Sequence, residues 1–222
     1  MLRIYKVAEG DAAPHPLAVH DVALMLKVGN LALIPTETVY GIGVAVNTFA
    51  STDGIPTPES GYARIFSLKQ REFSQTVPWL VGGPEALDRY GRDVPAQIRK
   101  LAEAFWPGAL TFIVPASADV PAFMQAADGT VALRASASPI VQALVRACKS
   151  PLAVTSANTH GAPAPAAFKD VEPRILQGVD VAVNAGATPC RDASTIVAFK
   201  DGKLNIIRQG ALSAERIRTV LS

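Results

Sequence analysis

Residues 31–43, LALIPTETVYGIG, begin as an apolar run and then become polar and rich in glycine. The first four residues are typical of a buried strand, and Pro35 ends its ladder because proline has no N–H to donate. The hydroxyls and carboxylate of residues 36–38 are then expected at the rim of a sheet. Gly41 and Gly43 allow the backbone to approach a ligand or another strand closely. An ordinary strand–turn–strand with a threonine-capped turn explains this stretch equally well.

The same glycines do not form a dinucleotide-binding fingerprint. Gly41-Ile42-Gly43 would need a third glycine three residues later, and Val46 stands at that position. We therefore do not expect a Rossmann-type nucleotide site here.

The composition of the 222-residue chain indicates a folded protein of one large domain or two small ones. With 49% hydrophobic and 18% charged residues, the chain can bury a substantial core. A net charge of +2 does not by itself indicate nucleic-acid binding, although it is compatible with a local basic cleft. Cys148 and Cys190 have neither disulfide-framework nor zinc spacing.

The N-terminal sequence MLRIYKVAEGD carries acidic residues early and is not typical of a signal peptide. No segment approaches the roughly 18 apolar residues that a membrane span needs. We therefore expect a soluble, cytoplasmic protein that makes no contact with membranes.

Strand and helix patterns intermingle along the chain without a repeat or a linker. Further strands are expected at 2–7, 77–81, 110–114, 131–134, 152–155, 179–183, 194–199 and 204–208, the second interrupted by Pro78 and the last two as a hairpin. Helices are expected at 16–28, 62–68, 85–90, 95–105, 139–148 and 170–176, and after Ser213. Residues 47–61 are expected to form a surface loop or insertion. The pattern predicts one α/β domain, residues 1–222, around a mixed sheet.

Polar or basic side chains stand at the ends of many expected strands. These residues are Thr36, Tyr40, Arg134, Ser156, Asn158, Ser194 and Arg208, and Lys69 and Arg71 add two cations in a loop. If these ends converge, they form a pocket of hydroxyl and guanidinium groups suited to an anion, because arginine matches carboxylate and phosphate oxygens. Taken singly, each arginine is better explained as a solvated surface charge.

Other catalytic arrangements are not indicated. His15, His20 and His160 lack metal-ligand spacing, and the sequence contains no GxxxxGK[ST], GxSxG or CxxC motif. Glu37 is the notable acid near the glycines, and three roles stay open for it. It could orient its loop, help to hold a metal ion or stabilise the turn, and we expect no dedicated metal site.

Seven segments occur in the order and approximate spacing of one known family: PTETVYGIG, IFSLKQR, WPGALTFIV, TVALR, PLAVTSAN, STIVAF and IIRQGAL. From about Val19 to Ala211 the chain thus resembles the YrdC family, whose fold is a twisted mixed sheet flanked by helices with a concave basic cleft. The resemblance implies synthesis of threonylcarbamoyl-AMP and pyrophosphate from L-threonine, bicarbonate and ATP, the ATP with Mg²⁺. The product serves tRNA threonylcarbamoyladenosine modification, so tRNA, double-stranded RNA and tRNA-modification proteins are implied partners.

The resemblance also implies roles for individual residues. L-threonine would be held by Thr36, Arg134 and Ser194. ATP would be held by Arg71, Thr130, Ser156, Asn158 and Arg208, with Lys69 and Arg71 as the catalytic cations. Joining a carbamate to the α-phosphate needs alignment and charge neutralisation more than a strong base. For Lys69 and Arg71 to enter one cleft, the preceding helix must end at or just before Lys69, with Gln70 facing away.

The chain departs from the family pattern beside several of these residues. Glu72 stands where a proline usually follows the arginine, His160 replaces a serine, and Ala193 replaces a common glutamate. Residues 135–139, ASASP, also differ from the usual flank of Arg134. These departures favour a second interpretation, a non-catalytic RNA-binding or regulatory paralogue. A third is carbamoyl transfer through an adenylate to another acceptor, as in domains of hydrogenase maturation proteins.

Overall fold

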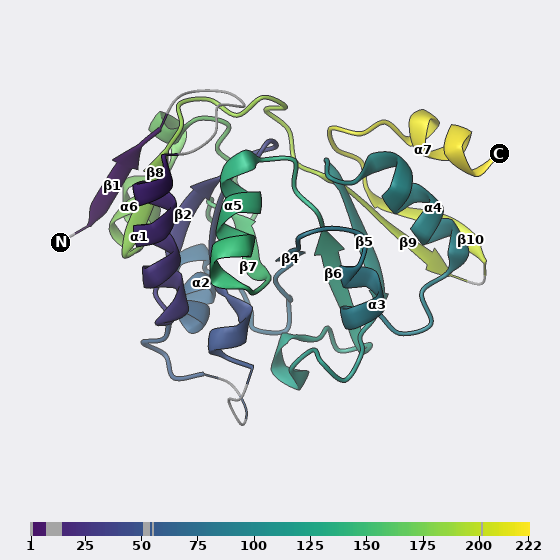
Figure 1. Cartoon of the computed structure of the whole chain (residues 1–222), viewed down its shortest axis with the longest axis horizontal. Coiled ribbons are helices and arrows are strands. Elements are labelled where there is room, and N and C mark those ends of the chain that lie inside the picture. Colours follow the sequence, from purple (N-terminus) through teal and green to yellow (C-terminus); the bar gives the residue numbers. More distant parts are fainter. Residues whose placement is uncertain (1, 8–14, 51–53, 55, 201) are drawn as a thin grey trace.

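The structure is a computed structural model that describes residues 2–7, 15–50, 54, 56–200 and 202–222. Within these residues, ten strands form one twisted sheet in the order β1-β8-β2-β3-β7-β4-β6-β5-β9-β10 (Figure 1). Parallel pairs such as β2–β8 and β5–β9 occur beside antiparallel pairs such as β3–β7 and β9–β10. The single mixed α/β domain predicted from the sequence is therefore confirmed.

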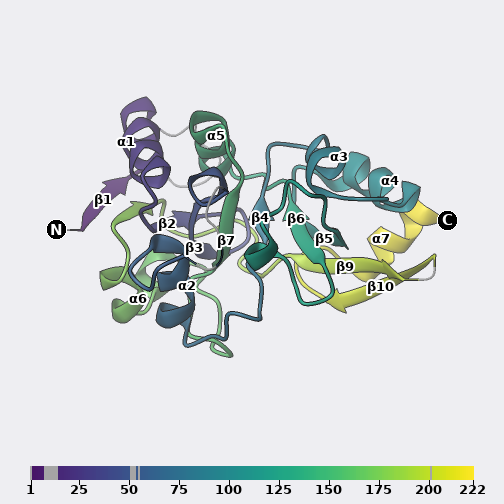
Figure 2. The ribbon, with the colours of Figure 1, turned by 90° about the horizontal axis from the view of Figure 1, so that it is seen from below.

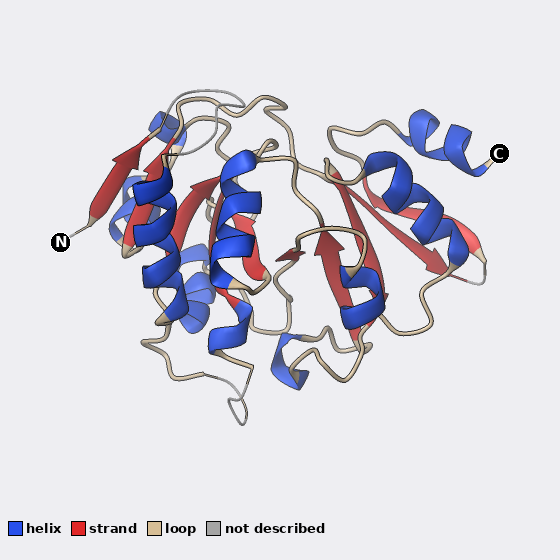
Figure 3. Ribbon diagram, viewed as in Figure 1, coloured by secondary structure: helices blue, strands red, loops and turns tan. Residues whose placement is uncertain are grey.

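Figure 3 colours the helices and strands, whose bounds along the chain are as follows. The strands are β1 (Arg3–Lys6), β2 (Ala32–Pro35), β3 (Tyr40–Ala45), β4 (Trp79–Leu80), β5 (Leu110–Pro115), β6 (Thr130–Arg134), β7 (Leu152–Ser156), β8 (Val181–Asn184), β9 (Thr195–Lys200) and β10 (Lys203–Arg208). The α-helices are α1 (Pro16–Lys27), α2 (Gly61–Lys69), α3 (Ala86–Tyr90), α4 (Ala96–Phe105), α5 (Pro139–Cys148), α6 (Pro173–Gln177) and α7 (Ala214–Leu221). Short 3₁₀ turns lie at Val46–Thr48, Ala122–Met124 and Phe168–Asp170.

The helices lie in two layers about the sheet (Figure 2). Helices α1, α5, α3 and α4 cover one side, and α2 and α6 lie on the other side near β2 and β8. Between α1, α5 and the sheet lies an apolar core that includes Val22, Leu26 and Leu144. At the opposite end, Val197 of β9 is buried while Ile196 and Ala198 are half-buried, so one face of this part of the sheet stays partly open.

The stretch 31–43 folds as β2, a tight turn and β3. The hydroxyl of Thr36 caps this turn, because it accepts the N–H groups of Thr38 and Val39 at 3.1 Å each and donates to the Val39 carbonyl at 2.7 Å. The threonine-capped strand–turn–strand, one of the two interpretations of this stretch, is therefore confirmed. It does not exclude the other interpretation, because a capped turn can still present its rim to a site.

Gly41 and Gly43 allow β3 to lie tightly against β7. A Cβ atom at Gly43 would lie 2.4 Å from the Ala153 carbonyl oxygen, and one at Gly41 would lie 2.6 Å from a methyl group of Val154. Both distances are below any normal contact, so these positions accept no side chain without a shift of the strands. The close approach expected from the glycines is thus an approach to another strand.

Two expected elements have different bounds in the structure. The strand predicted at 77–81 is reduced to Trp79–Leu80, because Pro78 has no N–H for the ladder. The helix predicted at 170–176 begins instead at Pro173, after a 3₁₀ turn, since proline is accepted in a first helical turn but not inside a helix. Of the expected loop 47–61, residues 51–53 and 55 lie outside the described residues.

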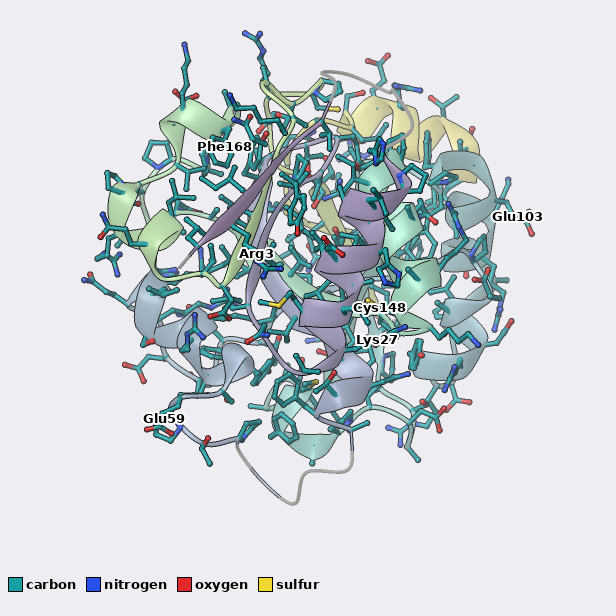
Figure 4. The ribbon with its side chains drawn as sticks, turned by 60° about the vertical axis from the view of Figure 1, so that its left-hand side comes forward. Arg3, Lys27, Glu59, Glu103, Cys148 and Phe168 are labelled. Atoms are coloured by element: carbon teal, nitrogen blue, oxygen red, sulfur yellow. The ribbon has the colours of Figure 1, made fainter. Side chains whose placement is uncertain are left out.

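Cys148 and Cys190 form no disulfide in the described part of the chain. Cys148 is buried between α5 and α1, near Lys27 (Figure 4). Burial raises the pKa of this thiol to about 11, against the opposing effect of the Lys27 ammonium. Cys190 is exposed. None of the described helices is long and apolar enough to cross a bilayer.

Candidate functional site

Several polar strand ends converge on one cleft. Six of the side chains singled out in the sequence line it: Thr36, Tyr40, Arg134, Ser156, Ser194 and Arg208. The cleft opens to solvent and has a cavity volume of about 100 Å³. The turn after β2 and the ends of β6, β7 and β10 all reach it, although they lie far apart in the sequence. The convergence on which the anion-site prediction depended is therefore present for these residues.

Arg134, the last residue of β6, is fixed in orientation before any ligand binds. Its Nε donates to the Gly108 carbonyl at 3.1 Å, and its Nη2 lies 2.6 Å from Glu37 Oε1. The second carboxylate oxygen of Glu37 accepts a short hydrogen bond from the Ser136 hydroxyl. Arg134, Glu37 and Ser136 are all buried, so this network holds the guanidinium rigidly at the wall of the cleft.

The charge of Glu37 depends on its partners. Burial works to raise the pKa of the carboxyl, but the Arg134 guanidinium and the Ser136 hydroxyl outweigh it and hold that pKa below its usual value. Glu37 therefore stays ionised and orients Arg134, a role that was not among the three considered from the sequence. Ser136, which belongs to the segment that departs from the family pattern, contributes to the same network.

Arg208 reaches the cleft from the bulged end of β10. The register between β9 and β10 shifts between Ile206 and Arg208, and such a bulge re-aims the following side chain. The Arg208 guanidinium donates to the Ser194 carbonyl at 2.8 and 3.2 Å, and to the Ser194 hydroxyl at 3.2 Å. That hydroxyl also lies 2.9 Å from the hydroxyl of Thr111.

Thr111 is a cleft residue that the sequence reasoning missed. It is buried and lies between Leu110 and Phe112, whose side chains belong to the apolar core. Strand alternation would have placed a hydroxyl at this position on the opposite face of the sheet from the core. That signal could have identified it.

The two arginines make the cleft electrostatically suited to an anion. Burial lowers the pKa of Arg208, and the positive charge of Arg134 lowers it further, while Asp192 opposes both. Two cations that repel each other across a partly desolvated space gain stability when an anion enters between them. A carboxylate or a phosphate group has the required charge and oxygen geometry.

Lys69 ends helix α2, as the sequence predicts, and Gln70 follows in the left-handed conformation with φ 51°. The Lys69 side chain is only 2% exposed and does not line the main cleft. Its ammonium donates to the carbonyls of Ser156 and Asn158 at 2.6 and 2.7 Å, and to Asn158 Oδ1 at 3.3 Å. Burial and the nearby Arg71 lower the pKa of Lys69 to about 8. In this structure Lys69 fastens the end of β7 and the loop behind it.

Arg71 lies at the border of the cleft. Its Nη1 donates to the Thr155 hydroxyl at 3.2 Å, and its Nη2 donates a short hydrogen bond to the Thr76 carbonyl. Thr155 lines the main cleft, and Arg71 itself lines a neighbouring hollow. Burial lowers the pKa of this guanidinium.

Three other residues singled out in the sequence make mainly structural contacts. The Tyr40 hydroxyl donates to the Gly186 carbonyl at 3.0 Å, and the Asn158 amide donates to the carbonyls of Thr159 and Ala162 at 2.9 and 2.6 Å. Thr130 begins β6, four residues before Arg134, and its hydroxyl donates to Asp128 at 2.7 Å. A strand advances about 3.3 Å per residue, which places Thr130 about 13 Å from Arg134. Asn158 and Thr130 do not line the cleft.

Comparison with known proteins identifies the family. The family model Sua5_yciO_yrdC, which carries the description telomere recombination, matches residues 24–210. The chain belongs to the Sua5/YciO/YrdC family. A protein of Mycobacterium tuberculosis, provisionally named a threonylcarbamoyl-AMP synthase, is 34% identical over 196 residues, which are 88% of this chain and 85% of that protein. The threonylcarbamoyl-AMP synthase of Pyrococcus abyssi is 29% identical over 88% of this chain and 55% of its own length.

Solved structures of the Sua5/YciO/YrdC family share the fold. The P. abyssi Sua5 structure complexed with L-threonine aligns with 100% of this chain, with a TM-score of 0.86 and 26% identity, and the chain spans 61% of that protein. Escherichia coli YciO aligns over 95% of both chains with a TM-score of 0.77, and its 18% identity indicates the fold alone. The family and fold implied by the sequence motifs are both confirmed.

Proposed function

We propose that this chain is an L-threonylcarbamoyladenylate synthase, a nucleotidyltransferase that makes threonylcarbamoyl-AMP and pyrophosphate from L-threonine, bicarbonate and ATP. The observation that supports this most is the joint presence of Arg134, Arg208 and the hydroxyls of Thr36 and Ser194 in one cleft. The chain aligns over its whole length with a Sua5 protein solved with L-threonine.

L-threonine is placed at Arg134. The guanidinium receives the carboxylate, and the hydroxyls of Thr36 and Ser194, which line the same cleft, are available to the amine and the side chain. Because Gly108 and Glu37 already hold Arg134, little ordering is needed when the amino acid binds. ATP is placed with its phosphates toward Arg208, Ser156 and Arg71.

The reaction then proceeds in two steps. The threonine amine attacks the bicarbonate carbon, and loss of water leaves a carbamate. A carbamate oxygen attacks the α-phosphorus of ATP, the bond to the bridging oxygen breaks, and pyrophosphate leaves with the electron pair. Both arginines of the cleft offset the negative charges that this step brings together. Lys69 acts as a positioning residue, because it holds the backbone at Ser156.

The proposal includes Mg²⁺ only as the ion that accompanies ATP. Among the described residues there is no group of three or more His, Cys, Asp or Glu side chains that could hold a metal ion. Glu37 is engaged by Arg134 and Ser136. No reaction step is therefore assigned to a metal held by protein ligands. The product would serve tRNA modification in the cytoplasm, with tRNA and tRNA-modification proteins as partners.

The proposal is tested by pyrophosphate release from the purified chain with ATP, bicarbonate and each amino acid in turn. We expect release that depends on both bicarbonate and L-threonine, because a cleft with one carboxylate-binding arginine and several hydroxyls selects a small hydroxylated amino acid. Serine is the matched comparison, since it lacks only the methyl group. A protein that solely binds RNA would release no pyrophosphate with any amino acid, and that result would contradict the proposal.

A further inference from the structure

A second hollow borders Arg71 beside the main cleft. Its cavity volume is about 550 Å³, and its apolar wall consists of Pro56, Pro58, Ala63, Phe66 and Phe73. Arg71 connects the two spaces, because it lines this hollow while its Nη1 donates to Thr155 of the main cleft. A ligand with an apolar part and an anionic part can therefore contact both spaces across one guanidinium.

The apolar wall contains a pair of stacked aromatic rings. The rings of Phe66 and Phe73 lie 4.2 Å apart between centroids, with an angle of 19° between their planes. Phe66 is buried, whereas Phe73 is 41% exposed. Phe73 thus shields Phe66 and leaves its own surface available. An exposed aromatic ring in a concave apolar setting is a platform on which a flat ring system stacks.

The polar groups that line the hollow fit a nucleobase better than a further phosphate. Ser67, Gln70 and Glu72 line the hollow as well as Arg71. The Glu72 carboxylate repels anions and accepts hydrogen bonds from amino groups such as that of adenine. L-threonine, the other organic substrate, has no ring to stack.

We propose that the adenine ring of ATP stacks on Phe73 in this hollow, with the phosphates passing Arg71 into the main cleft. This inference rests on the proposed synthase function and assigns the base of its nucleotide to a site. Phe73 is then a substrate-binding residue that stands outside the family motifs seen in the sequence. Glu72, one of the departures from the family pattern, lines the same hollow.

The test compares ATP with tripolyphosphate, which carries the phosphates without a base. We expect Phe73→Ala to weaken ATP binding in calorimetry by about five- to 150-fold, because stacking a base on an aromatic side chain contributes about 1–3 kcal/mol. Tripolyphosphate affinity should change by less than about twofold. Phe73→Leu, which keeps an apolar side chain without a flat ring, should behave like Phe73→Ala. Leu24→Ala, at an exposed apolar residue of α1, is the matched control and should alter neither affinity.

A second variant provides a direct signal for stacking. In Phe73→Trp, ATP should quench the emission of the new indole and tripolyphosphate should not, while the native Trp79 and Trp106 are buried and supply a constant background. The inference is overturned if Phe73→Ala binds ATP like the wild type, or if saturating ATP leaves the indole emission unchanged. If threonine-dependent pyrophosphate release persists in either case, the synthase proposal still stands. A wild-type chain that binds no ATP would contradict both.

Discussion

Replacement of Arg134 by alanine should lower the free energy of unfolding by about 3–5 kcal/mol, because it leaves the buried Glu37 carboxylate without its opposite charge. Chemical denaturation of the wild type and the variant measures the difference. The double variant Arg134→Ala/Glu37→Gln is the matched control, since it removes the carboxylate charge as well. It should recover much of the loss, and a double variant no more stable than Arg134→Ala would contradict the ion-pair account.

In Arg134→Ala, the contribution of Glu37 to the free energy of unfolding should depend on pH in the opposite direction from the wild type. In the wild type, the pKa of Glu37 is held below its usual value, so its contribution to stability is present above pH 4.5 and is lost as the pH falls through the folded-state pKa. Without Arg134, burial remains as the largest effect on Glu37 and raises its pKa. The Glu37-dependent part of the stability of Arg134→Ala should then decrease as the pH rises above about 4.5. The double variant should lack this dependence.

Arg134→Ala should also reduce affinity for L-threonine by at least tenfold, because a charge-assisted hydrogen bond contributes about 1.5–3 kcal/mol. Calorimetry at a temperature where the variant is folded separates this effect from stability. The Arg134→Ala/Glu37→Gln variant should bind threonine as weakly as Arg134→Ala even though it is more stable. Threonine binding at wild-type strength in either variant would contradict the placement of the carboxylate.

Replacement of Lys69 by methionine should reduce pyrophosphate release by more than tenfold, because Ser156 and Asn158 lose the ammonium that fixes their carbonyls. The buried carbonyl of Asn158 and the half-buried carbonyl of Ser156 lose this donor, and a buried acceptor left unsatisfied costs about 1–3 kcal/mol of stability. Arg64→Ala is the matched control on the same helix. Arg64 pairs with Asp180 at 3.0 Å and does not line the cleft, so its loss should lower stability but leave the activity of the folded enzyme unchanged.

The burial of the Lys69 ammonium can also be tested by measuring the free energy of unfolding as a function of pH. Its pKa is about 8 in the folded chain against 10.5 for an unperturbed lysine. At pH values between these two pKa values, Lys69 therefore takes up a proton when the chain unfolds. Lys69 should therefore make the free energy of unfolding rise with pH above about 8, and this contribution should be absent in Lys69→Met. If the wild type and Lys69→Met show the same dependence of stability on pH, the account of a buried Lys69 ammonium held by Ser156 and Asn158 is wrong.

Most of the fold could be predicted because its signals are local. The spacing of apolar residues defined α1 and α5 almost to the residue, and the turn after Lys200 defined the β9–β10 hairpin. The interruption at Pro78 was expected, whereas the helix expected at 170–176 was misplaced because Pro173 begins it instead. Strand order depends on pairing between distant segments, and single-strand patterns contain no information on which neighbours will meet.

The site was predictable in its chemistry and less so in its geometry. Motifs at strand ends located Thr36, Arg134, Ser194 and Arg208, and all four line the cleft. The sequence did not indicate that the Lys69 ammonium is enclosed by backbone carbonyls, because such contacts involve atoms that every residue has. Nor did it indicate the Phe66–Phe73 stack, since the two rings come from the body of α2 and the loop after it.

The most direct test of the synthase proposal is mass spectrometry of the nucleotide product formed from ATP, L-threonine and ¹³C-bicarbonate. We expect an adenylate with the mass of threonylcarbamoyl-AMP that contains the labelled carbon, together with an equal amount of pyrophosphate. An adenylate without the label, or one formed equally well without L-threonine, would contradict the account of Arg134, Arg208 and their cleft as the place where these three substrates are joined.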